Sequence, residues 1–284
     1  MEFPRTDRSS DHDGGGGGVH RPCGIGRTAD GRRVYFALPE APFGGLAEKC
    51  LVDARRCITV PDGLDDVTAA ALANPGMSAW TALVERARLQ RGETVLVNGA
   101  TGSAGRLAVQ LAKYLGAGKV VGTGRNRAEL DEVGALGADI VVPFDLSAGN
   151  EAGAKEYERA LIAEFEHGVD VVIDYLWGES ARTVIVAIAK AVEDAHPVRF
   201  VHVGGASRAE SIELQGAALR SSAIQLMGSG VKSVPFAKLL EAIAKVFEIA
   251  RPANLKIATK TLPLSAIEEA WKLPGKPRVV IRTQ

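Results

Sequence analysis

The stretch TVLVNGATGSAGRLAVQLAKYLG, residues 94–116, constrains the fold of this chain more than any other. An apolar run is followed directly by Gly99, Gly102 and Gly105, and then by apolar residues at the i, i+3, i+4, i+7 spacing of a helix. A strand that turns into a helix in this way directs free backbone N–H groups and the positive end of the helix dipole at whatever lies above the turn. We interpret the stretch as a phosphate-binding loop; the alternative is an ordinary turn that contains glycine.

The glycines of this loop have separate expected tasks. A β-carbon in the loop would keep a pyrophosphate from approaching the backbone, and Gly105 would let the helix pack closely on the strand. Rival motifs are missing from the sequence, which contains no G-x-x-x-x-G-K-[ST], no Tyr-x-x-x-Lys and no G-x-S-x-G. These absences argue against Walker-type nucleotidases, short-chain reductases and serine hydrolases.

Apolar runs and amphipathic segments alternate from Ser78 onward. This alternation predicts a parallel sheet with helices on both faces, as in an α/β doubly wound (Rossmann) fold that binds a dinucleotide. The expected strands are 94–98, 119–123, 139–143, 169–175, 199–203 and 223–228, and the expected helices are 103–115, 127–136, 151–166 and 179–192.

The segments on either side of this region differ from it. Residues 1–20 contain five successive glycines and are expected to form a flexible tail. Residues 21–77 hold short β-rich runs broken by Pro and Gly, followed by a short helix over VTAAALA, 67–73. Residues 231–284 predict an amphipathic helix, a strand, a helix with a capping box made by Ser265 and Glu268, and a closing strand. We expect this last part to return to the small β-rich domain, leaving 78–230 as the dinucleotide-binding domain.

The overall charge and the cysteines exclude several kinds of partner. Thirty-four basic residues balance thirty-four acidic ones, so we expect no nucleic acid and no membrane as partners. The apolar runs are too short to span a bilayer and the N-terminus lacks a signal-peptide core, which makes a cytoplasmic protein the expectation. The three cysteines form neither a CxxC pair nor a disulfide framework, so no metal site is predicted.

The end of the second expected strand favours NADP over NAD. An NAD-binding fold carries an acidic residue about 20 positions after the loop, where this chain has Gly124, Arg125, Asn126 and Arg127. A guanidinium group offers a planar, bidentate match to a 2′-phosphate, which a carboxylate would repel. We therefore predict that Arg125 binds the 2′-phosphate of NADP(H) with help from Arg127. The alternative is that both arginines are solvated residues at the start of a helix.

Five segments together resemble a known family. ANPGMSAW, GETVLVNGATGSAGRLAVQLAK, VVIDYLWG, LRSSAIQLMGSG and RVVI resemble the zinc-independent, quinone oxidoreductase-like branch of the medium-chain dehydrogenase/reductase superfamily, over residues from about Gly24 to the end. The resemblance implies an N-terminal GroES-like domain, a Rossmann domain that binds NADPH, and a terminal segment that returns to the first domain. It also implies homodimers that reduce a small-molecule quinone, enone or related carbonyl compound.

The resemblance also implies roles for individual residues. Ser78 would contact the nicotinamide side of the cofactor, and Phe144 would flank the adenine. The pyrophosphate would lie on Gly102, Ser103 and Ala104, beside Gly105, and the phosphate of the adenosine on Gly124 and Arg125. The nicotinamide would lie beside two strand ends, one at Gly204 and Gly205 and the other at Gly228, Ser229 and Gly230.

Two departures from the family limit what it implies. Zinc-dependent relatives carry a cysteine ligand where this chain has Asn74, and their GHE-type motif is missing, so a zinc alcohol dehydrogenase is not expected. The segment GIGRTADGRRVYF resembles the middle of the family's barrel, so we expect only a partial GroES-like domain over 21–77. Two functions stay open on this basis, an active NADPH-dependent reductase and an NADPH-binding protein with impaired catalysis. No proton donor is assigned, Tyr35 and Tyr175 being candidates by residue type alone.

Overall fold

A computed structural model describes residues 23–40, 44–273 and 275–283. The expected flexible tail, residues 1–20, lies outside the described residues. The chain divides into two compact units. One unit runs from Ser78 to Pro235, and the other combines the residues up to Met77 with those from Phe236 onward. Each unit has hydrophobic clusters of its own.

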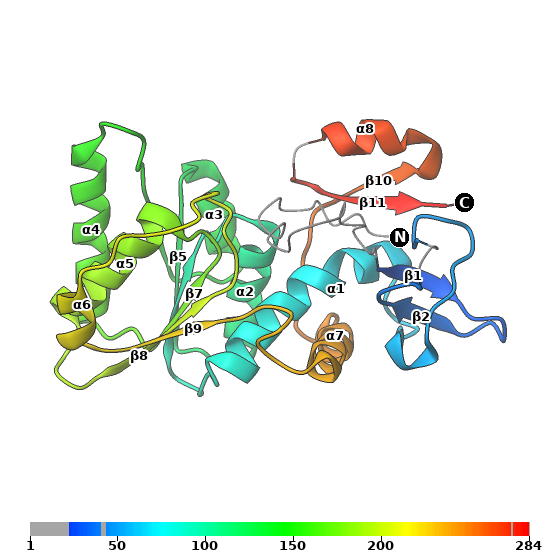
Figure 1. Cartoon of the computed structure of the whole chain (residues 1–284), viewed down its shortest axis with the longest axis horizontal. Coiled ribbons are helices and arrows are strands. Elements are labelled where there is room, and N and C mark those ends of the chain that lie inside the picture. The colour runs from blue at the N-terminus through cyan, green and yellow to red at the C-terminus, as the bar shows by residue number, and fades with distance from the viewer. Residues whose placement is uncertain (1–22, 41–43, 274, 284) are drawn as a thin grey trace. The chain divides into compact units, whose positions relative to one another are not determined.

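The unit 78–235 is built on a six-stranded parallel sheet with the order β6-β5-β4-β7-β8-β9 (Figure 1). Its first strand, β4, lies inside the sheet; the chain builds outward to β6 and then returns to build the other half from β7 to β9. This order is that of a doubly wound dinucleotide-binding fold, so the predicted fold class is confirmed. The strands are β4 Thr94–Asn98, β5 Lys119–Gly124, β6 Ile140–Pro143, β7 Val171–Asp174, β8 Pro197–His202 and β9 Ala223–Gly228.

Helices cover both faces of this sheet (Figure 1). The four longer helices begin and end within one residue of their predicted bounds, because their apolar residues are regularly spaced. The helices are α2 Ser103–Tyr114, α3 Arg127–Ala135, α4 Glu151–Glu166, α5 Gly178–Ala191 and the short α6 Gly216–Arg220.

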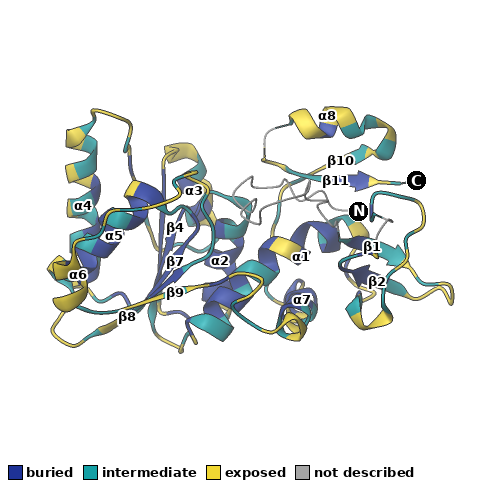
Figure 2. Cartoon of the chain, viewed as in Figure 1, coloured by how far each residue is buried: buried dark blue, intermediate teal, exposed yellow. Residues whose placement is uncertain are grey.

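The core of this unit lies between the sheet and its helices (Figure 2). Val95, Leu96 and Val97 of β4 are completely buried, as are Val171, Val172 and Ile173 of β7. Strands covered on both faces read as continuous apolar runs, which is why the sequence marks them clearly. The inner sides of α4 and α5 pack with these strands in one cluster that includes Tyr157, Leu161, Phe165, Val184 and Ile185.

The other unit joins the two ends of the sequence. It contains the antiparallel strands β1 Gly24–Arg27, β2 Arg33–Phe36 and β3 Cys57–Thr59, the parallel pair β10 Thr259–Pro263 and β11 Arg278–Arg282, the helices α7 Phe236–Ile249 and α8 Ile267–Lys272, and the 3₁₀ turn η2 Ala54–Arg56. The Tyr35 ring of β2 meets the Phe247 ring of α7 edge-on, with 6.0 Å between centroids. Val280 of β11 packs with Ala70 and Ala71 in one cluster.

Two sequence predictions about local structure need correction. The helix expected over 67–73 is α1 Asp66–Trp80, which contains Pro75 and continues into the π-helical segment η3 Thr81–Arg86. Its alanine run is fully buried, so packing stabilises a helix that the Asn-Pro-Gly sequence alone disfavours. The capping box is wrong, because Ser265 lies within the 3₁₀ turn η4 Leu264–Ala266 and α8 starts after Ala266 without a side-chain cap.

Candidate functional site

The glycine loop connects β4 to α2 at the carboxyl edge of the sheet. Gly99 has φ +87°, a left-handed conformation that a residue with a side chain adopts at a cost. Helix α2 begins at Ser103, and its N-cap position is Gly102, which has no side chain to cap the first N–H groups. No acidic residue lies in the first turn of α2. The loop therefore presents uncapped N–H groups and the positive end of a helix dipole, which is the arrangement that binds anions.

The fold requires glycine at position 105 and leaves position 102 open. A β-carbon on Gly105 would lie 2.3 Å from the carbonyl oxygen of Gly99, so only glycine allows this approach of α2 to β4. This is the close packing that the sequence predicts for Gly105. At Gly102 the nearest atom to a β-carbon, again the Gly99 oxygen, would be 3.6 Å away, an ordinary contact. Packing does not require glycine there, whereas a ligand that approaches the loop backbone would.

The glycines at the ends of β8 and β9 have the same property as Gly102. None has a φ in the left-handed range, and β-carbons placed on them would meet at most one protein atom within 4 Å. Since glycine adds backbone freedom to the unfolded chain, its use where the fold does not need it points to an approaching ligand. The glycines concerned are Gly204, Gly205, Gly228 and Gly230. Gly228 ends β9 and the others come just after β8 or β9, at the sheet edge where β4 leads into the glycine loop.

The adenosine corner predicted from the sequence lies at the end of β5. A β-carbon on Gly124 would lie 2.7 Å from the methyl group of Thr101, so this glycine lets the loop rest against β5. Arg125 follows it, is exposed, and forms no ion pair within the residues that the structure describes. Arg127 is the first residue of α3, and its guanidinium lies 3.6 Å from Asp131 on an exposed face.

Phe144 is brought to this corner by its backbone. Its N–H donates to the carbonyl oxygen of Gly124 at 3.0 Å. Its ring is buried and packs on the Tyr157 ring, with 4.8 Å between centroids. The contact of this residue with an adenine stays a prediction.

Ser78 lies in α1 next to the buried hydroxyl of Tyr175, which follows β7. The two hydroxyl groups are close, but the Tyr175 hydroxyl does not meet the geometry of a hydrogen bond. Burial raises the pKa of Tyr175 well above its usual range, so the hydroxyl keeps its proton at neutral pH. The Tyr175 backbone is fixed on both sides, since its N–H donates to Asn98 and its carbonyl oxygen accepts from Ala206.

A buried polar network at the same edge was not predicted from the sequence. The side-chain oxygen of Asn98, the residue before Gly99, accepts hydrogen bonds from three hydroxyl groups. Asn98 Nδ2 donates to Asp174 Oδ1 at 2.8 Å, and both side chains are completely buried. Burial raises the pKa of Tyr157 to about 12, which keeps its hydroxyl a donor. The hydroxyl donors and their distances to Asn98 Oδ1 are Thr123 (2.7 Å), Ser180 (2.8 Å) and Tyr157 (3.1 Å).

Asp174 extends the network to the next turn and the next strand. Its carboxylate accepts from the backbone N–H groups of Leu176 and Trp177, and His202 Nδ1 lies 2.8 Å from Oδ2. These bonds hold Trp177 at φ +59°, an unfavourable conformation for a bulky residue. Leu176 in turn lies against Gly99. The network thus fixes the residue that begins the glycine loop. Its one sequence signal is a polar residue ending each of two apolar strands, Asn98 and Asp174.

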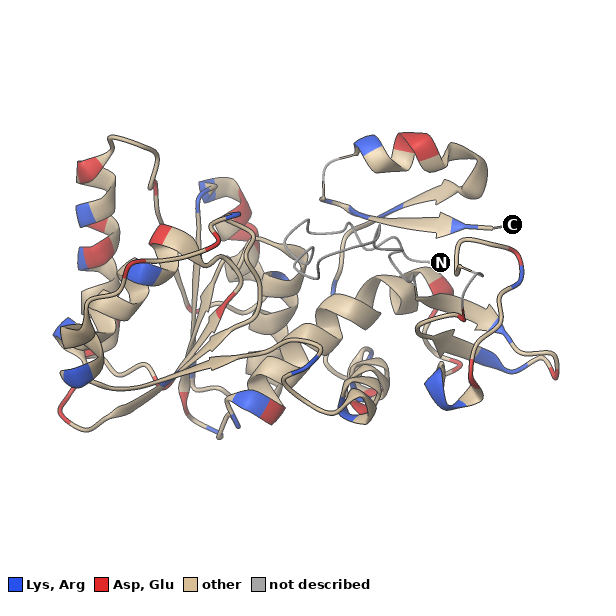
Figure 3. Cartoon of the chain, viewed as in Figure 1, with Lys and Arg blue, Asp and Glu red and all other residues tan. Residues whose placement is uncertain are grey.

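The described residues hold no group of three or more His, Cys, Asp or Glu side chains that could bind a metal ion. Asn74, which the resemblance places where zinc-dependent relatives carry a ligand, is exposed on α1. Across the described part of the chain, no helix is long and apolar enough to cross a membrane. Both basic and acidic residues lie along the helices α3, α4 and α5 (Figure 3).

Comparison with known proteins identifies the family. The model of the zinc-binding dehydrogenase family matches residues 104–247. The chain belongs to this family. A protein named "probable NADPH-dependent quinone reductase tdiC", from Emericella nidulans, is 36% identical over 142 residues, which are 50% of this chain and 38% of that protein. The trans-enoyl reductase pgmF of Aspergillus terreus is 31% identical over 114 residues, 39% of this chain and 32% of that protein. The chain thus spans well under half the length of these two relatives.

Solved structures have the same fold. A mycobacterial protein in complex with NADPH superposes with a TM-score of 0.67 at 20% identity, covering 85% of this chain and 70% of that one. A quinone oxidoreductase from Pseudomonas syringae gives a TM-score of 0.67 at 22% identity, covering 88% and 74%. An NAD-dependent alcohol dehydrogenase gives 0.66 at 25% identity, covering 88% and 68%. These structures show the fold, whereas the family match and the similarity to the Emericella nidulans quinone reductase support the quinone oxidoreductase-like branch that the motifs predict.

Proposed function

We propose that this protein is an NADPH-dependent oxidoreductase that transfers hydride to a quinone, an enone or a related carbonyl compound without zinc. The observation that carries the proposal is the glycine loop, which opens α2 with uncapped N–H groups at the carboxyl edge of a doubly wound sheet. In this proposal residues 78–230 form the NADP-binding domain of a cytoplasmic enzyme. Residues 21–77 and 231–284 form its partial GroES-like domain.

The residues present fit the cofactor. Gly102 leaves the loop backbone open to a pyrophosphate, which Ser103 and Ala104 would bind through their N–H groups. Arg125, which has no carboxylate partner among the described residues, would bind the 2′-phosphate, assisted by Arg127. The nicotinamide would lie along the open glycines at the ends of β8 and β9 and contact Ser78 and Ser229.

The bound cofactor would supply the hydride, and the chain would supply orientation. The buried Asn98–Asp174 network holds the loop before any ligand arrives, so little reorganisation is needed on binding. The buried Tyr175 hydroxyl beside Ser78 has no hydrogen-bond partner among the described residues, which leaves it free to donate to a bound ligand. The absence of β-carbons at Gly204 and Gly205 would let the nicotinamide approach the backbone closely.

Cofactor titration of an Arg125 variant tests the proposal. We expect NADPH to raise the melting temperature of the wild type more than NADH does, because a ligand that binds the folded state stabilises it. Arg125→Gln is expected to weaken NADPH binding by about tenfold to a hundredfold, since a charge-assisted bond to phosphate is lost, and to leave NADH binding unchanged. Arg159→Gln on α4, an exposed arginine, is the matched control.

Two results would contradict this assignment. Equal stabilisation by NADPH and NADH would contradict the assignment of a 2′-phosphate site. Stabilisation by neither cofactor would contradict the assignment of a dinucleotide site. Turnover of NADPH with a small benzoquinone then separates a reductase from an NADPH-binding protein with impaired catalysis.

We further propose that the protein forms a homodimer and that β9 contributes to it. This strand ends the sheet order, and Leu226 on it is exposed. An unpaired strand edge with apolar side chains is a template for pairing with a second chain. Light scattering of the wild type and of Leu226→Lys tests this, a monomeric mass for the wild type being the contrary result.

A further inference from the structure

One arginine bridges the two ends of the turn that follows β9. Arg86 is the last residue of η3, and its Nε donates to the carbonyl oxygen of Gly228 at 2.8 Å. Its Nη1 donates to the carbonyl oxygen of Ser233 at 3.4 Å. A guanidinium group can make both bonds because its donors are held in a rigid plane. The side chain therefore spans the segment Gly228–Ser233 from a helix 142 residues earlier in the sequence.

The bridged segment is otherwise held mainly by its own atoms. Ser233 Oγ accepts from the N–H of Gly230 at 2.7 Å and donates to its carbonyl oxygen, and the Ser233 N–H donates to the same oxygen. The Ser229 N–H donates to the carbonyl oxygen of His202 in β8, and Val231 is largely exposed. Two glycines in six residues give this turn high backbone freedom. The pairing of Gly228 with His202 and the Ser229 bond hold the start of the segment on β8, and beyond them its position depends on the Arg86 bonds.

Arg86 has no other evident task. Within the described residues it forms no ion pair with a carboxylate, and its hydrogen bonds go to backbone oxygens alone. The outer side of the turn is open, since β-carbons on Gly228 and Gly230 would meet nothing within 4 Å. An arginine that orders an open glycine turn prepares a surface for a ligand rather than filling a core.

We propose that Arg86 is a positioning residue for the nicotinamide half of NADPH, acting through the turn Gly228–Gly230. This inference rests on the proposed function. The Arg86 bonds hold the turn in its ligand-ready conformation, so that binding does not have to order it. Losing them weakens contacts to the nicotinamide half and leaves the adenosine half, bound at the glycine loop and at Arg125, unaffected.

Two ligands separate these halves. The dissociation constants of NADPH and of 2′-phospho-ADP-ribose, which lacks the nicotinamide, are measured by calorimetry for the wild type, Arg86→Gln and Arg86→Lys. We expect NADPH to bind Arg86→Gln about tenfold more weakly, as for a lost pre-ordered contact, while the fragment binds within about twofold of the wild type. Arg86→Lys carries the charge without the planar donors, so it is expected to show the same selective loss.

Arg88→Gln is the matched control. Arg88 lies two residues further along, is exposed, and its side chain forms no hydrogen bond with a described residue. We expect this variant to bind both ligands as the wild type does. Ser233→Ala provides a second route, because it removes the hydroxyl that closes the same turn, and it should weaken NADPH selectively.

The outcomes are distinguishable. Equal weakening of both ligands, or of neither, in Arg86→Gln and Ser233→Ala overturns the role of Arg86 while leaving the proposed function in place. A wild type that binds neither ligand overturns the proposed function itself. If Arg86→Gln does not fold, selective loss in Arg86→Lys and Ser233→Ala decides the inference alone.

Discussion

At the scale of single residues, glycine serves two separable purposes in this loop. Gly105 is required by packing, and Gly102 is not. We expect Gly105→Ala to lower the free energy of unfolding by about 2–3 kcal/mol, because the new methyl group would meet backbone atoms that cannot move aside. Gly102→Ala is expected to stay within about 1 kcal/mol of the wild type and to lose most NADPH binding. Urea unfolding and cofactor titration of the two variants measure these effects.

Each variant serves as the control for the other, because both substitutions add one methyl group and the two positions are three residues apart. If Gly102→Ala were destabilised and still bound NADPH, glycine at this position would serve the fold and not the cofactor. The loop would then be an ordinary turn that contains glycine. That was the alternative left open by the sequence, and the spacing of the glycines cannot decide it. The sequence predicts where the glycines lie in the strand and helix, whereas their different tasks depend on distances of a few tenths of an ångström.

The polar network around Asn98 shows what residue patterns leave out. The side chains that bond Asn98 directly are 25 to 82 positions from it along the chain. A polar residue at the end of an apolar strand is expected to face solvent as often as the core, so Asn98 and Asp174 carried little signal. Only the register of β4 beside β7, which pairs Asn98 with Asp174, brings the two side chains together.

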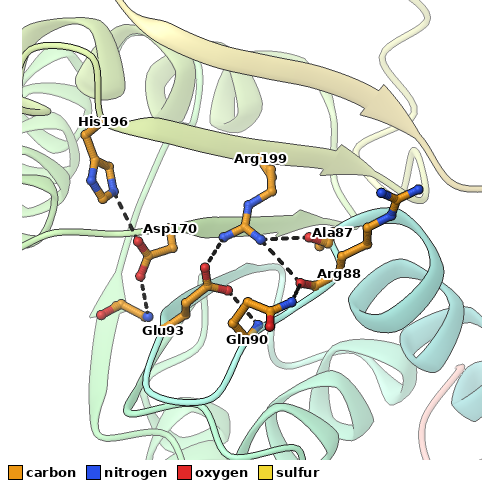
Figure 4. A network of polar contacts seen from close by, with 8 residues as sticks. Ala87, Arg88, Gln90, Glu93, Asp170, His196 and Arg199 are labelled. Atoms are coloured by element: carbon orange, nitrogen blue, oxygen red, sulfur yellow. Dashed lines mark hydrogen bonds and ion pairs between the residues drawn. The ribbon is translucent and has the colours of Figure 1, made fainter.

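At the scale of elements, a second polar network joins the amino ends of β4, β7 and β8 (Figure 4). Arg199 of β8 forms an ion pair of 2.5 Å with Glu93 and donates to the carbonyl oxygen of Ala87. The other Glu93 oxygen accepts from the N–H of Gln90. Asp170, which precedes β7, accepts from the N–H of Thr94, and His196 Nε2 lies 3.2 Å from its other oxygen. The network ties the segment between η3 and β4 to the sheet.

We expect Glu93→Gln to lower the free energy of unfolding by about 2 kcal/mol, because the partly buried Arg199 loses its counter-charge. The substitution preserves the shape of the side chain, so the loss reports charge. Urea unfolding at low and high salt measures it. Glu248→Gln breaks the exposed pair with Lys245 and is expected to change stability by less than about 0.5 kcal/mol. Equal effects of the two changes would mean that the Arg199 pair behaves as a surface contact.

Elements were predictable where their burial is uniform. The inner strands β4, β5, β7 and β8 are largely buried, and the predicted ends of the strands in this sheet lie within two residues of the observed ones. The length of α1 was underestimated, because Pro75 and Gly76 are typical of a helix end. In the structure Gly76 lets α7 pack closely, since a β-carbon there would lie 2.7 Å from Val246. The π-helical segment η3 was not predicted from the sequence.

At the scale of the whole molecule, buried tyrosines should make the protein sensitive to alkali. Burial raises the pKa of Tyr157 to about 12 and the pKa values of Tyr35 and Tyr175 well above their usual range. A raised pKa in the folded state means that the folded chain holds its protons more tightly than the unfolded chain. These groups therefore contribute stability that is complete below about pH 10, the ordinary tyrosine pKa, and is lost as the pH rises toward the folded values.

The free energy of unfolding should accordingly fall by up to about 1.4 kcal/mol per pH unit for each such tyrosine above about pH 10. Urea midpoints at rising pH, followed together with tyrosinate absorbance, measure the slope. Tyr157→Phe removes one titrating group and should make the slope shallower. It should cost only about 1 kcal/mol at neutral pH, because Thr123 and Ser180 still donate to Asn98. A slope unchanged by this substitution would contradict the role of Tyr157, and the alkaline loss would then arise from Tyr35 and Tyr175. Since Tyr35 lies in one unit and Tyr175 in the other, Tyr35→Phe and Tyr175→Phe would next show which unit sets the alkaline limit.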